Sequence, residues 1–221
     1  MENMKKLLIL SFVIFLIPLK SFSLIEVDIT RGNLNPLPLA VSPLSIDNNS
    51  RNNFKRILDK ENIGAEISLI VENNLKTSGL FNPLDKDAFL QAPDIANIKP
   101  RFEDWNLIKA QALITGKVSF VENKLRVEFR LWDVLAGKEM MALAFTTVPN
   151  NWRRVGHIIT DKVYERLTGE KGYFDTRIIY VAEEGPKTNR IKKLAIMDQD
   201  GANNKFLTLG NELVLTPRFD P

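Results

Sequence analysis

The 221-residue sequence contains no cysteine and only one histidine, His157. The lack of cysteine excludes disulfide bonds, thiol nucleophiles, iron–sulfur clusters and cysteine-ligated zinc. A single histidine removes most metal sites and proton relays built from imidazole groups. The remaining composition, with 44% hydrophobic and 26% charged residues, is that of a globular protein rather than a disordered one. We therefore expect no cofactor and no metal, and a protein that is not an enzyme.

The N-terminal residues have the pattern of an export signal. Lys5 and Lys6 precede an apolar segment, residues 7–19, which is too short to cross a bilayer of ~30 Å comfortably as a helix. Ser21 and Ser23 then provide the small residues of a cleavage site. We predict that residues 1–23 are a signal peptide that directs export, with an uncleaved anchor as the alternative.

The excess of basic residues belongs largely to this predicted signal. The whole chain has a formal charge of +3, and removing residues 1–23 lowers that charge to about +1 because lysines dominate the removed segment. Nucleic-acid binding depends on clustered basic residues that neutralise phosphates. We therefore expect no nucleic-acid partner.

The start of the predicted mature chain has the alternation of a β-strand. Ile25, Val27 and Ile29 alternate with Glu26 and Asp28, which places the apolar side chains on one face. No upstream strand is left to form a hairpin with this segment. It must pair elsewhere in its own domain or with another molecule.

Residues 24–170 are predicted to form one α/β (α+β) domain with a mixed sheet. A buried strand is expected at 39–41 and a polar surface segment at 47–53. Helical spacing follows from Ile63 to Leu75, with Gly79 at its C-terminal end, and a short helix near Trp105 runs into a strand at 112–114. Apolar and polar residues alternate at 124–131, which predicts a strand. The more apolar segment at 140–148 is expected to pair with it as the second strand of a hairpin. Apolar spacing from Trp152 to Leu167, closed by Gly169, predicts the last helix.

Residues 171–221 have a different pattern. Short strands are expected at 176–181, 193–197 and 206–208, with a turn at 198–201 and no helix. Short strands with polar turns are typical of a β-propeller, but about 50 residues cannot form one, because a propeller has at least about four blades. We therefore expect the first strands of an incomplete propeller.

Three groups of residues could carry chemistry. His157 could act as a pH-sensing or catalytic imidazole, but the sequence offers no second histidine or cysteine to complete a site, so we interpret it as a bonded histidine at the domain junction. Asp198, Asp200 and Gly201 resemble part of a calcium loop but lack its further ligands, which favours a hairpin turn. The three tryptophans are interpreted as core or junction residues rather than a ligand cage.

Several segments, in order and spacing, resemble the TolB family of the periplasmic Tol–Pal envelope system. The matching segments are residues 78–85, 163–172, 174–181, 196–201 and 216–221. The resemblance implies an N-terminal α/β domain followed by a β-propeller, and a role in outer-membrane integrity and cell-division constriction. It implies a protein peripheral to the envelope membranes whose mature N-terminal strand adds to the C-terminal domain of TolA. The implied binding residues are Leu24, Ile25, Glu26, Val27, Asp28, Ile29 and Thr30.

The resemblance also leads us to expect a chain truncated at its C-terminus. The family's propeller carries the docking surface for the lipoprotein Pal, so binding to Pal is in doubt for this sequence. Two alternatives stay open: the front part of a propeller-bearing periplasmic hydrolase, and a split product without function.

Overall fold

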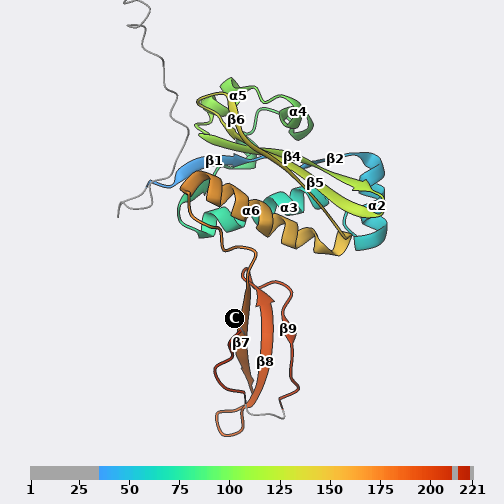
Figure 1. Ribbon diagram of the computed structural model, residues 1–221, viewed down its shortest axis with the longest axis vertical. Coiled ribbons are helices and arrows are strands. Elements are labelled where there is room, and N and C mark those ends of the chain that lie inside the picture. The colour runs from blue at the N-terminus through green and yellow to red at the C-terminus, as the bar shows by residue number, and fades with distance from the viewer. Residues whose placement is uncertain (1–34, 211–213, 220–221) are drawn as a thin grey trace, which may run out of the picture.

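The structure is a computed structural model that describes residues 35–210 and 214–219. The predicted signal peptide, its cleavage residues Ser21 and Ser23, and the predicted binding segment Leu24–Thr30 lie outside the described residues. Two parts are visible in Figure 1, a larger α/β part and a smaller sheet beyond it. The larger part contains β1 (Leu37–Val41), β2 (Ser45–Ile46), α2 (Asn48–Leu58), α3 (Ile63–Thr77), β3 (Phe81–Pro83), η1 (Lys86–Ala88), α4 (Pro93–Ile98), α5 (Phe102–Leu107), β4 (Ala112–Val121), β5 (Lys124–Asp133), β6 (Lys138–Thr147), η2 (Pro149–Asn151) and α6 (Trp152–Thr168). The smaller part contains β7 (Arg177–Glu184), β8 (Ile191–Asp198) and β9 (Lys205–Phe206).

The larger part is built on a mixed sheet. Its strands follow the order β3-β1-β4-β5-β6, and the short β2 also pairs with β4. Strand β1 is parallel to both β3 and β4, whereas β4, β5 and β6 form an antiparallel meander. The predicted α/β fold class with a mixed sheet is therefore confirmed.

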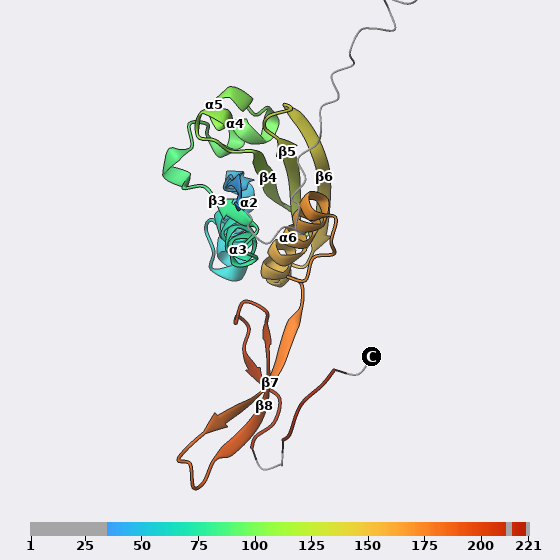
Figure 2. The ribbon, with the colours of Figure 1, turned by 90° about the vertical axis from the view of Figure 1, so that its left-hand side faces the viewer.

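The sheet buries a large core on one face and a small one on the other. Helices α3 and α6 lie side by side against the first face, while α4 and α5 lie on the opposite side (Figure 2). The alternation in β5 produces this division, because Leu125, Val127, Phe129 and Leu131 all point into the larger core. The smaller core gathers around Trp105. The predicted helices at 63–75 and 152–167 are both present, and Gly169 ends α6 in the left-handed conformation with φ 76°.

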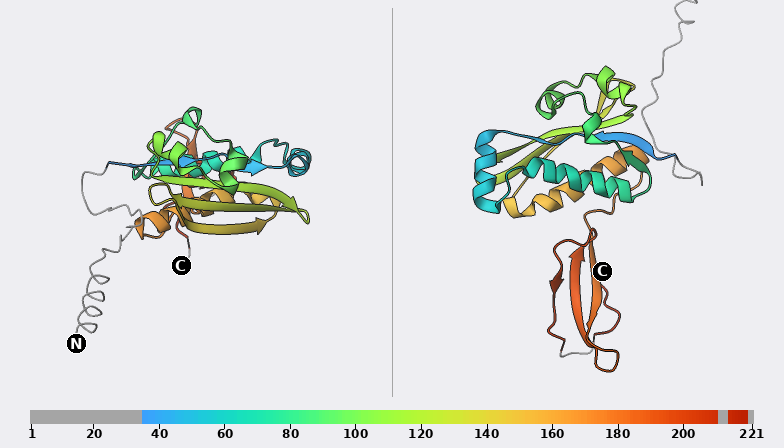
Figure 3. Two further views of the ribbon diagram at one scale, coloured as in Figure 1. Left: turned by 90° about the horizontal axis from the view of Figure 1, so that it is seen from above. Right: turned by 180° about the vertical axis from the view of Figure 1, so that it is seen from behind.

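The polar segment at 47–53 lies largely at the surface as predicted, with only Ser50 buried, but the predicted surface segment did not include a helix. These residues begin helix α2, which lies at one end of the sheet (Figure 3). Asp47 caps this helix by accepting a hydrogen bond from the Ser50 backbone N–H at 2.8 Å. Ser50 is buried, and its hydroxyl donates to Asp47 Oδ2 and accepts from the Phe120 N–H at 2.8 Å. Polar residues thus serve a cap and a strand contact that composition alone does not reveal.

We expect the substitution Ser50→Ala to destabilise the protein by about 2 kcal/mol, because it leaves the Phe120 N–H without its acceptor. The hydrogen bond from Ser50 also lowers the pKa of the Asp47 carboxyl below its ordinary value. A lowered carboxyl pKa stabilises the fold above the unfolded-state pKa, and this stabilisation is lost as the pH falls. Chemical unfolding gives the free energy of unfolding at pH 7 and at pH 3. The decrease between these two pH values should therefore be smaller in the variant than in the parent. Asn52→Ala changes an exposed residue of the same helix. It should leave the free energy of unfolding at pH 7, and its decrease at pH 3, nearly unchanged.

The smaller part is an open antiparallel sheet in the order β7-β8-β9. The predicted third strand at 206–208 is wrong in its extent, since β9 covers only Lys205 and Phe206. Beyond it, Leu194 donates its backbone N–H to the Thr208 hydroxyl at 2.9 Å. The Leu207 backbone N–H still donates to the Leu194 carbonyl oxygen at 2.7 Å, so a side-chain acceptor replaces only one of the backbone bonds at this position. In the ranges that the structure describes, no helix is long and apolar enough to span a membrane.

Candidate functional site at the junction of the two parts

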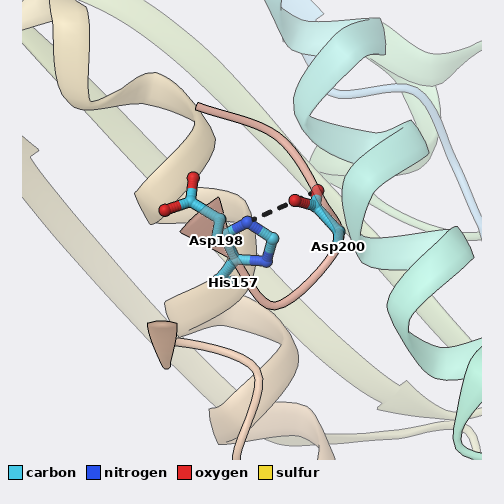
Figure 4. Close-up of side chains that lie close together, drawn as sticks. All are labelled: His157, Asp198 and Asp200. Carbon is cyan, nitrogen blue, oxygen red and sulfur yellow. Dashed lines mark ion pairs between the residues drawn. The ribbon is translucent and has the colours of Figure 1, made fainter. Parts of the chain in front are cut away.

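Polar side chains from four chain segments meet where the smaller sheet touches the larger part. We call this contact the junction. One side consists of α3 and α6, and the other consists of the linker 171–176 and the turn 198–201 between β8 and β9. Figure 4 shows His157 of α6 between Asp198 and Asp200 of the turn. These three side chains belong to segments about 40 residues apart in sequence, so only the tertiary structure brings them together.

His157 is buried at this junction and is bonded through one ring nitrogen. It is 3% exposed. Its Nδ1 lies 2.9 Å from Asn74 Nδ2, and the same amide nitrogen lies 3.2 Å from Thr160 Oγ1. On the other side of this amide, Gln199 Nε2 donates to Asn74 Oδ1 at 2.9 Å. The interpretation of His157 as a bonded junction histidine is confirmed.

The surrounding hydrogen bonds indicate which nitrogen of His157 carries the proton. The Thr160 hydroxyl donates to the Gly156 carbonyl oxygen at 2.8 Å, so its oxygen is left to accept from Asn74 Nδ2. With its amide oriented in this way, Asn74 also donates to His157 Nδ1. A neutral imidazole that accepts at Nδ1 carries its proton on Nε2.

The Nε2 side of His157 faces the acidic turn. Nε2 is 3.7 Å from Asp200 Oδ2 and, among the described residues, has no hydrogen-bond partner. Arg153 forms an ion pair with the same carboxylate oxygen of Asp200. Burial lowers the pKa of His157, with an opposing contribution from Asp200 and Asp198 and a smaller lowering contribution from Arg153. The histidine is therefore held in its neutral form at neutral pH.

The same three side chains have the ligand types of a metal site, with candidate atoms of His157, Asp198 and Asp200 within 4.8 Å of one another. Two features argue against a cation there. The guanidinium of Arg153 already neutralises Asp200. A metal bound at Nε2 would also require the proton on Nδ1, where Asn74 donates. The residues present therefore fit a charged junction better than a metal centre.

Two clefts open beside the junction. The first has a volume of about 530 Å³, and the second, which is mostly polar, of about 410 Å³. Trp152 lies in the first, where the Lys60 ammonium is 4.8 Å from its ring centroid. The first cleft is lined by Glu66, Leu69, Ile70, Asn73, Asn74, Thr77, Trp152, Arg153, Gln199 and Asp200. The second is lined by Asn150, Asn151, Arg153, Arg154, His157, Asp175, Thr176, Arg177, Asp198 and Asn203.

The linker into the smaller sheet is held by a single carboxylate. Asp161 of α6 accepts the backbone N–H of Phe174 at 2.7 Å through Oδ1 and that of Asp175 at 3.1 Å through Oδ2. The Phe174 ring is buried and packs edge-on against Tyr164 at 5.7 Å between ring centroids. Arg154 pairs with the Asp175 carboxylate at 3.0 Å, which raises the pKa of that guanidinium. Arg154 and Asp161 are two turns apart on α6 and share one face of the helix, so the linker is held along that face.

The structure separates the other residues considered from the sequence. Trp105 is buried in the smaller core, Trp132 donates to Thr115 at 2.9 Å, and Trp152 lines the first cleft, so the tryptophans form no cage. Sequence reasoning missed Asn74, Gln199 and Asp161. Asp161 follows the polar spacing of α6, and only its partners reveal its role. Asn74 instead stands on the buried face of α3, four residues after Ile70, and a polar residue at such a position is the signal that could have found it.

Comparisons with known proteins give a consistent assignment. Residues 25–140 match the family described as the TolB amino-terminal domain, and residues 164–221 match the TolB beta propeller domain. The "Tol-Pal system protein TolB" of Pelagibacter ubique (strain HTCC1062) is 83% identical over 211 residues, which cover 95% of this chain and 47% of that protein. A crystal structure of TolB from Acinetobacter baumannii has a TM-score of 0.67 and 24% identity, covering 87% of this chain and 43% of that one.

The structural likeness supports the fold, including the start of a propeller in the smaller sheet. The chain spans about half the length of the curated relative and of the solved structure that it matches.

Proposed function

The chain belongs to the TolB family, and from this premise we propose that it acts in the periplasm as a binding component of a Tol–Pal envelope system. It works without catalysis, by presenting a strand and surfaces to protein partners. Its mature N-terminal segment, Leu24–Thr30, binds the C-terminal domain of TolA, and the complex serves outer-membrane integrity and cell-division constriction. Residues 1–23 direct its export and are removed after Ser23.

One observation carries this proposal. The match to the TolB amino-terminal domain begins at Ile25, so it includes nearly all of the proposed binding segment. In that segment Ile25, Val27 and Ile29 share one face of an extended chain. A strand that adds to an exposed sheet edge supplies backbone hydrogen bonds, and its alternate side chains set the register. The alternation of residues 25–29 is the pattern that such a strand requires.

The chemistry of the junction supports a binding role rather than catalysis. A hydrolase needs a nucleophile within hydrogen-bond reach of a base. The Thr160 hydroxyl, which shares the Asn74 amide nitrogen with His157, donates to the Gly156 carbonyl oxygen within its own helix. Asp200 is paired with Arg153. The charged groups thus hold the two parts together.

Deleting residues 24–30 should abolish binding to the isolated C-terminal domain of TolA in isothermal titration calorimetry. The deletion precedes Leu37, the first buried core residue in the part of the chain that the structure describes, and the thermal unfolding midpoint of the deleted chain is measured alongside to separate lost binding from lost folding. Val27→Pro, which removes a backbone donor and disfavours a paired strand, should weaken binding at least tenfold. Glu26→Gln keeps the strand and serves as its matched control. An unchanged affinity after deletion would contradict the proposal, as would hydrolase activity of the purified chain.

A further inference from the structure

We propose that His157 makes the junction sensitive to pH: protonation of its imidazole weakens the contact between the turn 198–201 and helices α3 and α6. The smaller sheet is then held most firmly at neutral pH and loosens on acidification. The inference rests on the hydrogen-bond geometry around Asn74 and on the burial of His157. It is independent of the proposed binding to TolA.

Asn74 links the histidine to the turn. Its amide nitrogen donates to His157 Nδ1 and Thr160 Oγ1, and its oxygen accepts from Gln199 of the turn. Every polar atom of this side chain is therefore satisfied only when His157 Nδ1 is an acceptor. Gln199 makes this arrangement part of the docked state, because it is the residue that crosses from the smaller sheet.

Protonation reverses one bond in this arrangement. An imidazolium carries a proton on Nδ1, which would face the amide hydrogens of Asn74. Rotating the Asn74 amide would restore that bond, but it would point two donors at each other at Gln199. A further rotation of Gln199 would repair this contact, and the Thr160 hydroxyl would then have to turn from the Gly156 carbonyl oxygen to the Asn74 oxygen and give up its present bond. Accommodating the imidazolium therefore requires three groups to rearrange together around a buried charge. An unsatisfied buried polar group is costly, so the docked state disfavours protonation.

The charges around His157 act in both directions. Asp200 and Asp198 of the turn and Asp175 of the linker favour the imidazolium, whereas Arg153 of α6 opposes it. Asp200 is already paired with Arg153, which reduces its attraction for a second cation. Burial is the largest contribution and keeps the pKa of His157 below its ordinary value of about 6.5. The contact is then complete above about pH 6.5, weakens as the pH falls below it, and stops weakening below the lowered pKa.

Because His157 is the sole histidine, its ring can be observed directly by NMR in the full chain labelled with ¹⁵N. We expect the proton on Nε2 at pH 7.5 and a titration midpoint below about 6.5. Asn74→Asp, which supplies an acceptor to Nδ1, should raise the midpoint. Gln199→Ala, which frees the Asn74 amide to rotate, should raise it as well. A proton on Nδ1, or a parent midpoint at or above 6.5, overturns the proposal.

Hydrogen–deuterium exchange measures the contact itself. After correction for the pH dependence of intrinsic exchange, we expect segment 198–203 to exchange several-fold faster at pH 5.5 than at pH 7.5, while β4 and β5 stay unchanged. His157→Gln, which cannot titrate in this range, should remove the difference. If that variant unfolds, Gln199→Ala serves instead and should reduce the difference. An equal difference in the parent and the folded variant overturns the proposal.

Discussion

Replacing Gly64 with alanine should destabilise the protein by about 3 kcal/mol, although helix propensity alone predicts the opposite sign. Gly64 lies in the first turn of α3, and an added Cβ would overlap the backbone carbonyl oxygen of Leu44. Propensity favours alanine over glycine by about 1 kcal/mol in a helix interior. Overpacking costs about 1–3 kcal/mol, and here the obstacle is backbone, which cannot move to another rotamer.

The contact around Gly64 increases this cost. Ser68, one turn later, accepts the Leu44 backbone N–H at 2.9 Å and donates to the Ser42 carbonyl oxygen at 3.1 Å. Moving α3 away from Leu44 to make room would stretch these buried bonds, each worth about 1 kcal/mol. The steric cost and the weakened hydrogen bonds together exceed the gain in helix propensity. The substitution should therefore lower the free energy of unfolding rather than raise it.

Thermal unfolding followed by circular dichroism measures this effect, and a loss of about 3 kcal/mol corresponds to a midpoint roughly 6–12 °C lower in a protein of this size. Gly156→Ala in α6 is the matched control. Its added Cβ would lie 2.9 Å from Ile70 Cγ2 and 3.1 Å from Ile70 Cβ, which is a milder overlap than that with the Leu44 carbonyl oxygen at Gly64. We expect a smaller decrease there. A raised midpoint for Gly64→Ala would mean that α3 can move freely over the β1–β2 connection.

The sequence predicted the elements that repeat a pattern and missed those that depend on contacts between distant residues. The β5 strand and helix α6 were predictable, because burial on one face produces a period of two in the strand and of about 3.6 in the helix. Helix α2 was not, since its first half is polar and its identity depends on the Asp47 cap and on a bond from Phe120, 70 residues further on.

At the junction, too, the sequence did not reveal contacts between distant residues. His157 could be assigned to a domain contact, because a lone histidine on an amphipathic helix has few other roles. Its bond to Asn74 joins residues 83 positions apart, and the bond from Gln199 to Asn74 joins residues 125 apart. Each of the two residues is an ordinary amide in its own segment. Only the packing of α3 against α6, and of the turn against both, gives these amides a specific role.

The substitution Asp161→Ala should release the smaller sheet from the larger part without unfolding the latter. The Asp161 carboxylate accepts two backbone N–H groups of the linker, from Phe174 and Asp175. Hydrogen bonds to a charged group contribute about 1.5–3 kcal/mol each, so losing both costs about 3 kcal/mol or more. Both bonds lie between the two parts, and the larger core between the sheet and the helices contains neither Asp161 nor Phe174. The cost therefore falls on the contact between the parts.

Limited proteolysis distinguishes release of the smaller sheet from unfolding of the larger part. In the parent, we expect cleavage near residue 170 that removes Tyr173–Pro221, because the open sheet presents unpaired strand edges. Asp161→Ala should accelerate this cleavage at least tenfold, while the fragment ending near Glu170 stays resistant. Lys162→Ala is the matched control, since its half-exposed pair with Glu165 contributes little. Equal cleavage rates in Asp161→Ala and the parent would contradict the prediction and mean that the buried Phe174 ring and the Arg154–Asp175 pair hold the linker without the two backbone bonds.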